Sequence, residues 1–208
     1  MKYYPAFLNL ENKPAVVIGG GSVAERKVRS LMDAGATVKV ISPNITKNLQ
    51  KLKQKGLITH LTRNFRRGDT GKAFVVVACT SSSELNGRIA REASHLVNVI
   101  TEPDKGNYIV PSTVKRGPLT IAVATGGISP ALSKTIRKEL QDLYDREFAL
   151  YVKFIESIRQ QAMEKIADNK KREKFLKSLA SRSILEKLRT GSFQSVCKKV
   201  LADLKKIG

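Results

Sequence analysis

Hydrophobic residues in the first half of the chain recur in short runs, at a spacing typical of alternating strands and helices. Residues 14–18 (PAVVI) and 73–79 (AFVVVAC) are continuous apolar runs, as expected for strands buried on both faces of a parallel sheet. This pattern predicts an α/β fold built on a doubly wound, Rossmann-like parallel sheet. The expected elements are strands at 14–18, 37–42, 57–62, 73–79 and 96–101, and helices at 22–34, 46–55 and 83–94, the last with Ser83 as its cap.

The second half of the chain follows a different pattern. Residues 108–111 and 119–124 are predicted to form two short strands around the turn Arg116-Gly117-Pro118. From Ser129-Pro130 onward the apolar positions recur at helical spacing, with serine as a cap and proline in the first turn. We expect a helical region with breaks at Asn169 and Gly191, and with helices at 130–167, 171–181, 183–190 and 192–206.

Cysteine usage and hydropathy limit the possible environments. The chain has 208 residues, and no apolar run approaches the roughly 18 residues that a membrane span requires. The first residues lack the apolar segment of a signal peptide. Cys79 and Cys197 lie far apart, and neither forms a metal-ligand spacing with His60 or His95. We therefore expect a cytoplasmic protein that has no disulfide framework, no metal among its site residues and no membrane partner.

The charge balance suggests an anionic partner. Lys and Arg number 38 against 18 Asp and Glu, which gives a net charge of +20 that is spread along the chain. Such a field favours nucleic acid, an acidic membrane, or a small ligand rich in carboxylate or phosphate groups. Solubility alone is an equally good explanation, since net charge says nothing about fold.

The segment VVIGGGSVAERK carries the strongest chemical signal. It contains the pattern Gly19-x-Gly21-x-x-Ala24 between a predicted strand and a predicted helix, the context of a dinucleotide fingerprint. Gly19 permits a tight turn, Gly21 lets the backbone approach a pyrophosphate, and Ala24 lets the helix pack closely on the strand. The N–H groups of Ser22 and Val23 would then point at the anion. The alternative is a plain glycine turn.

The end of the second predicted strand leaves the choice of dinucleotide open. This position usually carries an acid that binds the ribose 2′-hydroxyl, but here the chain has Ser42-Pro43-Asn44. Ser42 or Asn44 could bind the ribose, whereas Lys47 could meet a 2′-phosphate, so NAD and NADP both remain possible. Thr80 follows the central strand and should line the cofactor cleft.

At this point the sequence resembles a known family. The segments YYPAFLNL, VVIGGGSVAERKVRSLMDAGATVKVISP, NVITEPDKGNYIVPS and IAVATGGISPALSKTIRKEL resemble precorrin-2 dehydrogenases, which also form the N-terminal module of siroheme synthases. The resemblance covers essentially the whole chain, and the GGGxVAxRK and TGGxSP patterns are its most specific parts. It implies NAD-dependent oxidation of precorrin-2 to sirohydrochlorin in siroheme biosynthesis, and some members also insert iron.

The resemblance also implies a domain organisation and a set of site residues. It implies a homodimer with an NAD-binding domain at 1–112, a dimerisation segment at 113–146 and a helical domain at 147–208. NAD contacts would fall on Ser22, Val23, Pro43, Asn44 and Thr80. The tetrapyrrole carboxylates would give the positive charge a partner, and the substrate-binding candidates are Lys115, Arg116, Gly126, Gly127, Lys134, Arg137 and Lys138. Any single basic residue among them could equally be a solvated surface residue.

The chain departs from the family at the catalytic position. Where the family has an aspartate implicated as general base, this sequence has Thr101, whose hydroxyl holds its proton too tightly near neutral pH. Glu102 and Asp104 follow within three residues and are the candidate replacements, although both could be ordinary loop acids. Proton loss to water is a third possibility. Thr125 lies where the family often has a small hydroxyl residue that faces the active site.

Two other functions compete with the dehydrogenase. One is a sirohydrochlorin chelatase for iron or cobalt on the same fold. The missing aspartate weakens this hypothesis more than it weakens the dehydrogenase hypothesis. The other is a nucleotide-sensing, nucleic-acid-binding protein, suggested by the charge of +20. We do not expect nucleic acid as a partner, because no helix-turn-helix, RNP or zinc-finger pattern is present.

Overall fold

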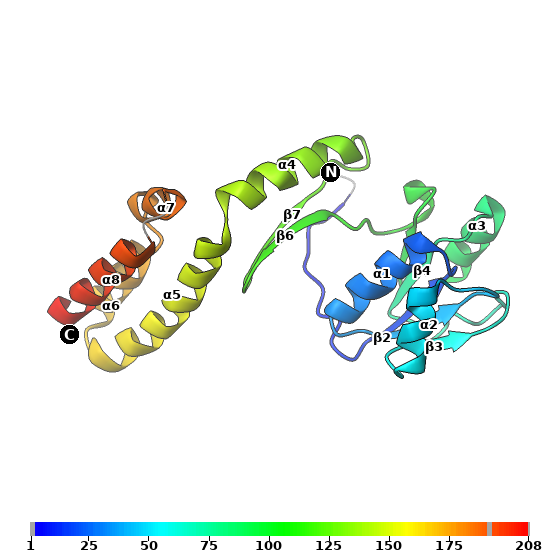
Figure 1. The fold of residues 1–208 in the computed structure, drawn as a ribbon, viewed down its shortest axis with the longest axis horizontal. Coiled ribbons are helices and arrows are strands. Elements are labelled where there is room, and N and C mark those ends of the chain that lie inside the picture. The colour runs from blue at the N-terminus through cyan, green and yellow to red at the C-terminus, as the bar shows by residue number, and fades with distance from the viewer. Residues whose placement is uncertain (1–2, 191–192, 208) are drawn as a thin grey trace. The chain divides into compact units, whose positions relative to one another are not determined.

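The computed structural model describes residues 3–190 and 193–207. The chain divides into two compact units, one ending at Val110 and the other beginning at Pro111. Figure 1 shows a sheet with helices in the first unit, and a hairpin followed by helices in the second. In the part of the chain that the structure describes, no helix combines the length and the apolar character that crossing a bilayer demands.

The first unit is built on a five-stranded sheet with the order β3-β2-β1-β4-β5. All four neighbouring pairs are parallel, and β1 is paired on both sides: Ile18 lies opposite Ile41 of β2 and opposite Ala78 of β4. The strands are β1 (Pro14–Ile18), β2 (Thr37–Ile41), β3 (Thr59–Leu61), β4 (Val75–Ala78) and β5 (Leu96–Val99). The predicted Rossmann-like parallel sheet is therefore confirmed.

Helices cover both faces of this sheet and bury its alternating side chains. Val17 of β1 packs in one core with Val28 of α1 and Leu49 of α2. Its neighbour Ile18 packs in the opposite core with Ile89 of α3. The helices are α1 (Ser22–Asp33), α2 (Lys47–Gln54) and α3 (Ser83–Glu92), with a 3₁₀ turn η1 (Pro103–Lys105) after β5.

The strand order creates the place for a ligand. From β1 the chain passes through α1 to β2 on one side, whereas β4 pairs with β1 on the other side. The loops that leave β1 and β4 therefore diverge, and they open a crevice at the carboxyl ends of these strands. In open parallel sheets this is where ligands bind.

The second unit begins with an antiparallel hairpin and continues as helices. Gly117 turns the hairpin with a positive φ of 59°, and Arg116 pairs with Leu119 beside the turn. Beyond the hairpin, the aliphatic side chains of α5 to α8 share a core with Tyr151, whose hydroxyl donates to the carbonyl of Leu179 at 2.8 Å. The elements are β6 (Ser112–Arg116), β7 (Leu119–Val123), α4 (Pro130–Leu143), α5 (Arg146–Lys165), α6 (Asn169–Ser178), α7 (Arg182–Arg189) and α8 (Phe193–Ile207).

Two expected strand and helix boundaries are wrong. Residues 108–111 form no strand, because pairing outward from the Gly117 turn ends at Ser112 opposite Val123. The helix expected over 130–167 is two helices, since Tyr144 leaves helical geometry and Asp145 caps α5 by accepting from the N–H of Phe148.

Smaller corrections concern caps and breaks. The cap of α3 is Ser82 rather than Ser83, because the Ser82 hydroxyl accepts from the N–H of Leu85. Asn169 begins α6 rather than breaking a helix, and Asp168 caps it. The expected break at Gly191 lies outside the described residues.

Candidate functional site

A cleft of about 790 Å³ opens at the carboxyl ends of β1, β2 and β4. Its walls come from the glycine turn before α1, from the loop after β2 and from the loop after β4. All eight residues predicted to bind the cofactor line it: Gly19, Gly21, Ser22, Val23, Ser42, Pro43, Asn44 and Thr80. The sequence predicted that these residues bind one ligand, and the fold places all of them around the same cleft.

The three glycines at the floor of the cleft are required for different reasons. Gly19 has a φ of +124°, and a Cβ there would lie 2.6 Å from the carbonyl oxygen of Cys79. A Cβ on Gly20 would lie 1.8 Å from the carbonyl oxygen of Asn44, so this turn packs directly against the loop after β2. A Cβ on Gly21 would meet nothing within 4 Å, and its backbone is ordinary and extended. Packing therefore explains the first two glycines, whereas the third leaves space for a ligand.

The N-terminus of α1 faces the same space. Gly21 is its N-cap residue, and no side chain caps this helix. The N–H groups of the first turn, which begins with Ser22 and Val23, have no partner within the helix. Because these residues line the cleft, the helix offers an anion both free donors and the positive end of its dipole. This arrangement suits a pyrophosphate.

Some polar groups of the loop after β2 are hydrogen-bonded within the protein. Ser42 is buried, and its hydroxyl donates to the carbonyl of Asn44 at 2.7 Å. Nε2 of His60 lies 2.8 Å from the carbonyl of Ser42 and anchors the same segment to β3. Ser42 can therefore only accept from a ribose hydroxyl, while the Asn44 side chain is exposed. Lys47 is exposed and does not line the cleft.

Asn86, which the sequence analysis missed, organises the loop after β4. Its side chain is fully buried, and its Oδ1 accepts from the N–H of Thr80 at 3.1 Å and from the Thr80 hydroxyl at 2.8 Å. Its Nδ2 donates to the Thr80 carbonyl at 3.1 Å and to the Thr101 hydroxyl at 3.4 Å. The only sequence signal was an amide next to apolar positions of α3.

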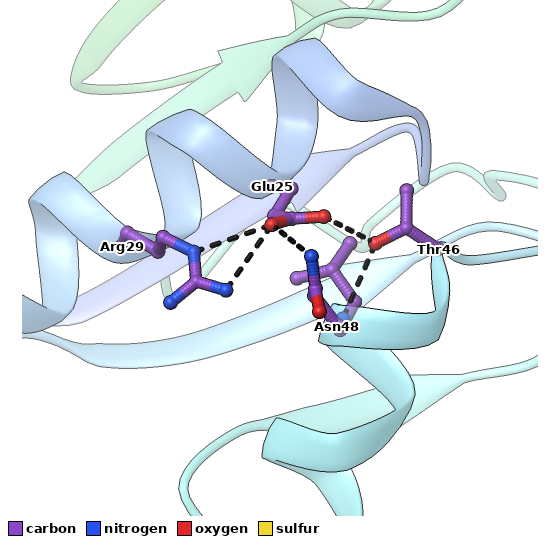
Figure 2. A network of polar contacts seen from close by, with 5 residues as sticks. Glu25, Arg29, Thr46 and Asn48 are labelled. Carbon is purple, nitrogen blue, oxygen red and sulfur yellow. Dashed lines mark hydrogen bonds and ion pairs between the residues drawn. The ribbon is translucent and has the colours of Figure 1, made fainter.

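A second missed residue, Glu25, connects two walls of the cleft. Its carboxylate accepts from the Thr46 hydroxyl at 2.6 Å, from Asn48 at 2.9 Å and from Arg29 at 3.1 Å. Figure 2 shows these donors converging on the one carboxylate from α1 and from the start of α2. Hydrogen bonding, first of all by Thr46, lowers the pKa of Glu25, so the group stays ionised.

Cys79 and Lys27 complete the surroundings of the glycine turn. The Cys79 thiol donates to the Ile18 carbonyl at 3.3 Å, and burial raises its pKa to about 11. Burial lowers the pKa of the half-buried Lys27 ammonium on α1. A thiol held in its protonated form is a poor nucleophile, so Cys79 is a packing residue of the cleft wall.

The cleft walls carry no formal charge despite the net charge of +20. Of the described residues that line the cleft, none is Lys, Arg, Asp, Glu or His. An anion in this cleft would therefore meet uncharged partners such as backbone N–H groups and hydroxyls.

Comparison with known proteins assigns this unit to a family. A family model described as "Putative NAD(P)-binding" matches residues 6–112, just over half of the chain. The chain belongs to this NAD(P)-binding family. A second model, described as "Sirohaem biosynthesis protein central", matches residues 116–143 of the same NAD(P)-binding chain.

Several curated proteins resemble the NAD(P)-binding chain along most of its length. "Siroheme synthase 3" of Aeromonas hydrophila is 34% identical over 182 residues, covering 86% of the chain and 39% of that protein. "Siroheme synthase" of Nitrosococcus oceani is 35% identical, covering 92% of the chain and 42% of that protein. "Siroheme synthase" of Zymomonas mobilis is 32% identical, covering 99% and 44%. The chain thus spans about two fifths of the length of these relatives.

The NAD(P)-binding chain also matches a solved structure along nearly its whole length. "SirC, precorrin-2 dehydrogenase" superposes with a TM-score of 0.81 and 22% sequence identity, covering 96% of this chain and 100% of that one. At this identity the match establishes that the two chains share a fold.

The loop after β5 contains the predicted catalytic position of the NAD(P)-binding unit. Thr101 is exposed and accepts from Asn86. The Glu102 carboxylate pairs with Lys105 at 2.7 Å and accepts from the Ser83 hydroxyl at 2.5 Å. These two contacts, Lys105 first, lower the pKa of Glu102, so it is a weaker base than an isolated glutamate. Asp104 is exposed within η1, and neither acid lines the cleft.

Arg116 in the second unit is held by a helix end. Its guanidinium donates to the carbonyls of Tyr144 at 2.5 Å, Gln141 at 3.0 Å and Lys115 at 3.0 Å. It thereby satisfies carbonyl groups at the C-terminus of α4, which otherwise lack partners. Its predicted role in substrate binding stays a prediction beside this observed contact.

The other substrate candidates lie on β6, on α4 and on the turn before α4. Lys134 and Lys138 are exposed on α4, and Lys115 is exposed on β6. Arg137 is half-buried and donates to Gln141 at 3.2 Å. The remaining two, Gly126 and Gly127, form the turn and have positive φ with open space around them. Thr125, the candidate active-site hydroxyl, exchanges hydrogen bonds with the backbone of Ser129. Across residues 3–190 and 193–207, no three His, Cys, Asp or Glu side chains gather as possible metal ligands.

Proposed function

We propose that this chain is an NAD⁺-dependent dehydrogenase that oxidises precorrin-2 to sirohydrochlorin in siroheme biosynthesis. The observation that carries the proposal is the open space at Gly21 beside the uncapped N-terminus of α1, inside a cleft whose walls come from three loops of the sheet. Membership of the NAD(P)-binding family supports the cofactor class. The names of the siroheme synthase relatives and of the precorrin-2 dehydrogenase structure support the substrate class.

The walls of the cleft favour NAD over NADP. A 2′-phosphate is usually met by an arginine or lysine near the end of the second strand. Here the loop after β2 offers Ser42, Pro43 and Asn44, and none of the described residues that line the cleft is a cation. The ionised Glu25 lies behind Thr46. A ribose hydroxyl fits these neutral partners better than a phosphate does.

The reaction removes two electrons and two protons from the tetrapyrrole. Bound NAD⁺ would accept a hydride, one proton would be released, and the products are sirohydrochlorin, NADH and H⁺. The chain's residues would hold the dinucleotide through the N–H groups of Ser22 and Val23, and the oxygen of Thr80 would face it as an acceptor. Glu102 and Asp104 remain the candidate bases, with water as the alternative. Because the pKa of Glu102 is lowered, its contribution should be modest.

The second unit is proposed to bind substrate and a second copy of the chain. The exposed cations Lys115, Lys134 and Lys138 suit the carboxylates of a tetrapyrrole. We propose a homodimer through residues 113–146, with residues 147–208 as a separate helical domain. Exposed apolar side chains on the segment 113–146 support this, with Ile128 91% exposed and Leu132 51% exposed. We also propose a cytoplasmic location, for which the free thiols of Cys79 and Cys197 are support.

The test is formation of NADH from precorrin-2 and NAD⁺, followed by absorbance. We expect turnover with the wild type and a clear preference for NAD⁺ over NADP⁺. Replacing Glu102→Gln and Asp104→Asn separately, with pH profiles of kcat, assigns the base. A wild-type protein that binds NAD⁺ and still forms no NADH from precorrin-2 would overturn the dehydrogenase assignment. If both variants keep the wild-type profile, water takes the proton and the assignment remains.

A further inference from the structure

The Glu25 carboxylate joins two segments that form different walls of the cofactor cleft. Glu25 lies in the first turn of α1, directly after the glycine turn. Its donors Thr46 and Asn48 lie at the start of α2, and Figure 2 shows both pointing across to α1. Thr46 itself lines the cleft.

The two walls touch closely at this point. The N–H of Thr46 donates to the carbonyl of Gly20 at 3.0 Å, and the carbonyl of Asn44 occupies the space that a Cβ on Gly20 would need. The Thr46 hydroxyl donates to Glu25 at 2.6 Å and accepts from the N–H of Leu49 at 3.2 Å. Glu25 therefore orients the hydroxyl that caps α2, and one carboxylate fixes both the loop and the helix that follows it.

Both carboxylate oxygens are used by the protein. Oε2 accepts from Thr46, and Oε1 accepts from Asn48 and from two nitrogens of Arg29. The side chain is only 16% exposed. Glu25 is thus not placed to bind a ribose itself, as an acid after the second strand usually does. Instead it holds the segment that presents Ser42 and Asn44.

We propose that Glu25 is a positioning residue for the dinucleotide, acting through Thr46 to hold the loop of residues 42–46 against the glycine turn. The inference rests on the proposed use of a dinucleotide. Glu25→Gln keeps the shape but removes the charge, and it turns an NH₂ group toward donors. Hydrogen bonds to a charged group are stronger than neutral ones, so we expect the Kd for NAD⁺ to rise about tenfold.

Kinetics distinguish positioning from simple loss of folded protein. A misplaced wall weakens ground-state and transition-state binding alike, so KM for NAD⁺ should rise by the same factor while kcat is retained. A fall in the folded fraction would instead lower the apparent kcat and leave KM unchanged.

The experiment measures NAD⁺ binding to the full chain by calorimetry and turnover with precorrin-2. Thr46→Val should reproduce the effect of Glu25→Gln. Thr46→Ser keeps the hydroxyl, so its affinity for NAD⁺ should stay near that of the wild type. Asp33→Asn is the matched control, since it removes a carboxylate from the exposed last residue of the same helix. Thermal unfolding of each variant reports its folded state.

The outcomes separate this inference from the proposed function. Folded Glu25→Gln that binds NAD⁺ within about twofold of wild type, or an equal loss in Asp33→Asn, overturns the positioning role and leaves the dehydrogenase standing. Should Glu25→Gln fail to fold, equal affinity of Thr46→Val and Thr46→Ser overturns it. If Glu25→Gln binds NAD⁺ tenfold more weakly than the wild type, and the wild type binds NAD⁺ but makes no NADH from precorrin-2, the positioning role is supported and the dehydrogenase is overturned.

Discussion

At the residue scale, three adjacent glycines have separate roles. The fingerprint spacing identified Gly19 and Gly21 from sequence, because the turn and the helix that they join are local. Gly20 was not identified, since its requirement comes from the Asn44 carbonyl in a distant loop. Glu25 was missed for the same reason, because its partners Thr46 and Asn48 lie more than 20 residues away. Asn86 was missed because its contacts with Thr80 and Thr101 depend on how the loops after β4 and β5 fold around it.

The glycines should respond differently to the same added methyl group. Gly20→Ala forces a Cβ onto a backbone oxygen, so we expect it to lower the free energy of unfolding by about 1–3 kcal/mol or more. Gly21→Ala has room and ordinary backbone angles, so its stability should stay within about 0.5 kcal/mol of wild type. Its affinity for NAD⁺ should fall, because the methyl occupies ligand space. Urea unfolding and calorimetry measure the two effects, and equal stability losses would contradict this explanation.

At the element scale, the five strands of the parallel sheet were predictable, whereas the first strand of the hairpin and several boundaries were not. Continuous apolar runs place β1 and β4 in a sheet buried on both faces, whichever helices cover it. The break between α4 and α5 was hidden because Tyr144 and Phe148 continue the apolar spacing across it, while the observed break depends on the Asp145 cap. The contact of Arg116 with the end of α4 spans more than 20 residues and leaves no local pattern.

Substitution of Asn86, which connects the loops after β4 and β5, should lower the stability of the fold. Replacing Asn86→Ala removes the protein partner of the N–H and the carbonyl of the half-buried Thr80, which costs about 1–3 kcal/mol. We expect lower stability in urea and faster amide hydrogen exchange at Thr80 and Thr101. The neighbouring exposed Glu84→Ala is the control, and a similar effect there would show that the loss reflects α3 in general.

An ion pair in the loop after β3 should make the free energy of unfolding depend on pH in the acid range. Two nitrogens of Arg63 donate to Asp69, and this contact holds the pKa of Asp69 below its ordinary value of 3.8. A lowered folded-state pKa stabilises the fold above the ordinary pKa, and this stabilisation is lost as the pH falls through the folded-state value. Asp69→Asn should therefore be less stable than wild type at neutral pH, and the difference should shrink on acidification. Urea unfolding across pH tests this, and a constant difference would contradict it.

At the scale of the whole molecule, the two units set different requirements for function. The described residues that line the cleft all belong to the first unit, so we expect binding of NAD⁺ to depend on residues of that unit. The second unit has apolar side chains exposed on and before α4, which a single chain leaves in water. The change of hydrophobic pattern in the second half of the chain indicated two units from sequence. The dimer was expected only through resemblance, because helical spacing alone does not say which faces meet another chain.

A substitution at one exposed side chain tests the proposed dimer. Ile128→Glu puts a charge on a residue that is 91% exposed in the single chain, so its stability should change little. If that residue is buried in a dimer, the charge should shift the assembly to monomers, as measured by light scattering after gel filtration. Leu201→Glu, on the partly exposed surface of α8, is the control. A wild-type chain that elutes as a monomer would contradict the proposal.

Because the walls of the cleft are uncharged, we expect the affinities for NAD⁺ and for the tetrapyrrole to depend differently on ionic strength. In a protein of charge +20, added salt screens the exposed lysines and lowers their affinity for a polycarboxylate. A dinucleotide bound by main-chain amides in an uncharged cleft should lose much less affinity. A titration with potassium chloride should therefore raise the KM of the tetrapyrrole steeply and leave that of NAD⁺ almost flat. Ionic strength would then separate substrate capture from cofactor capture without a single substitution.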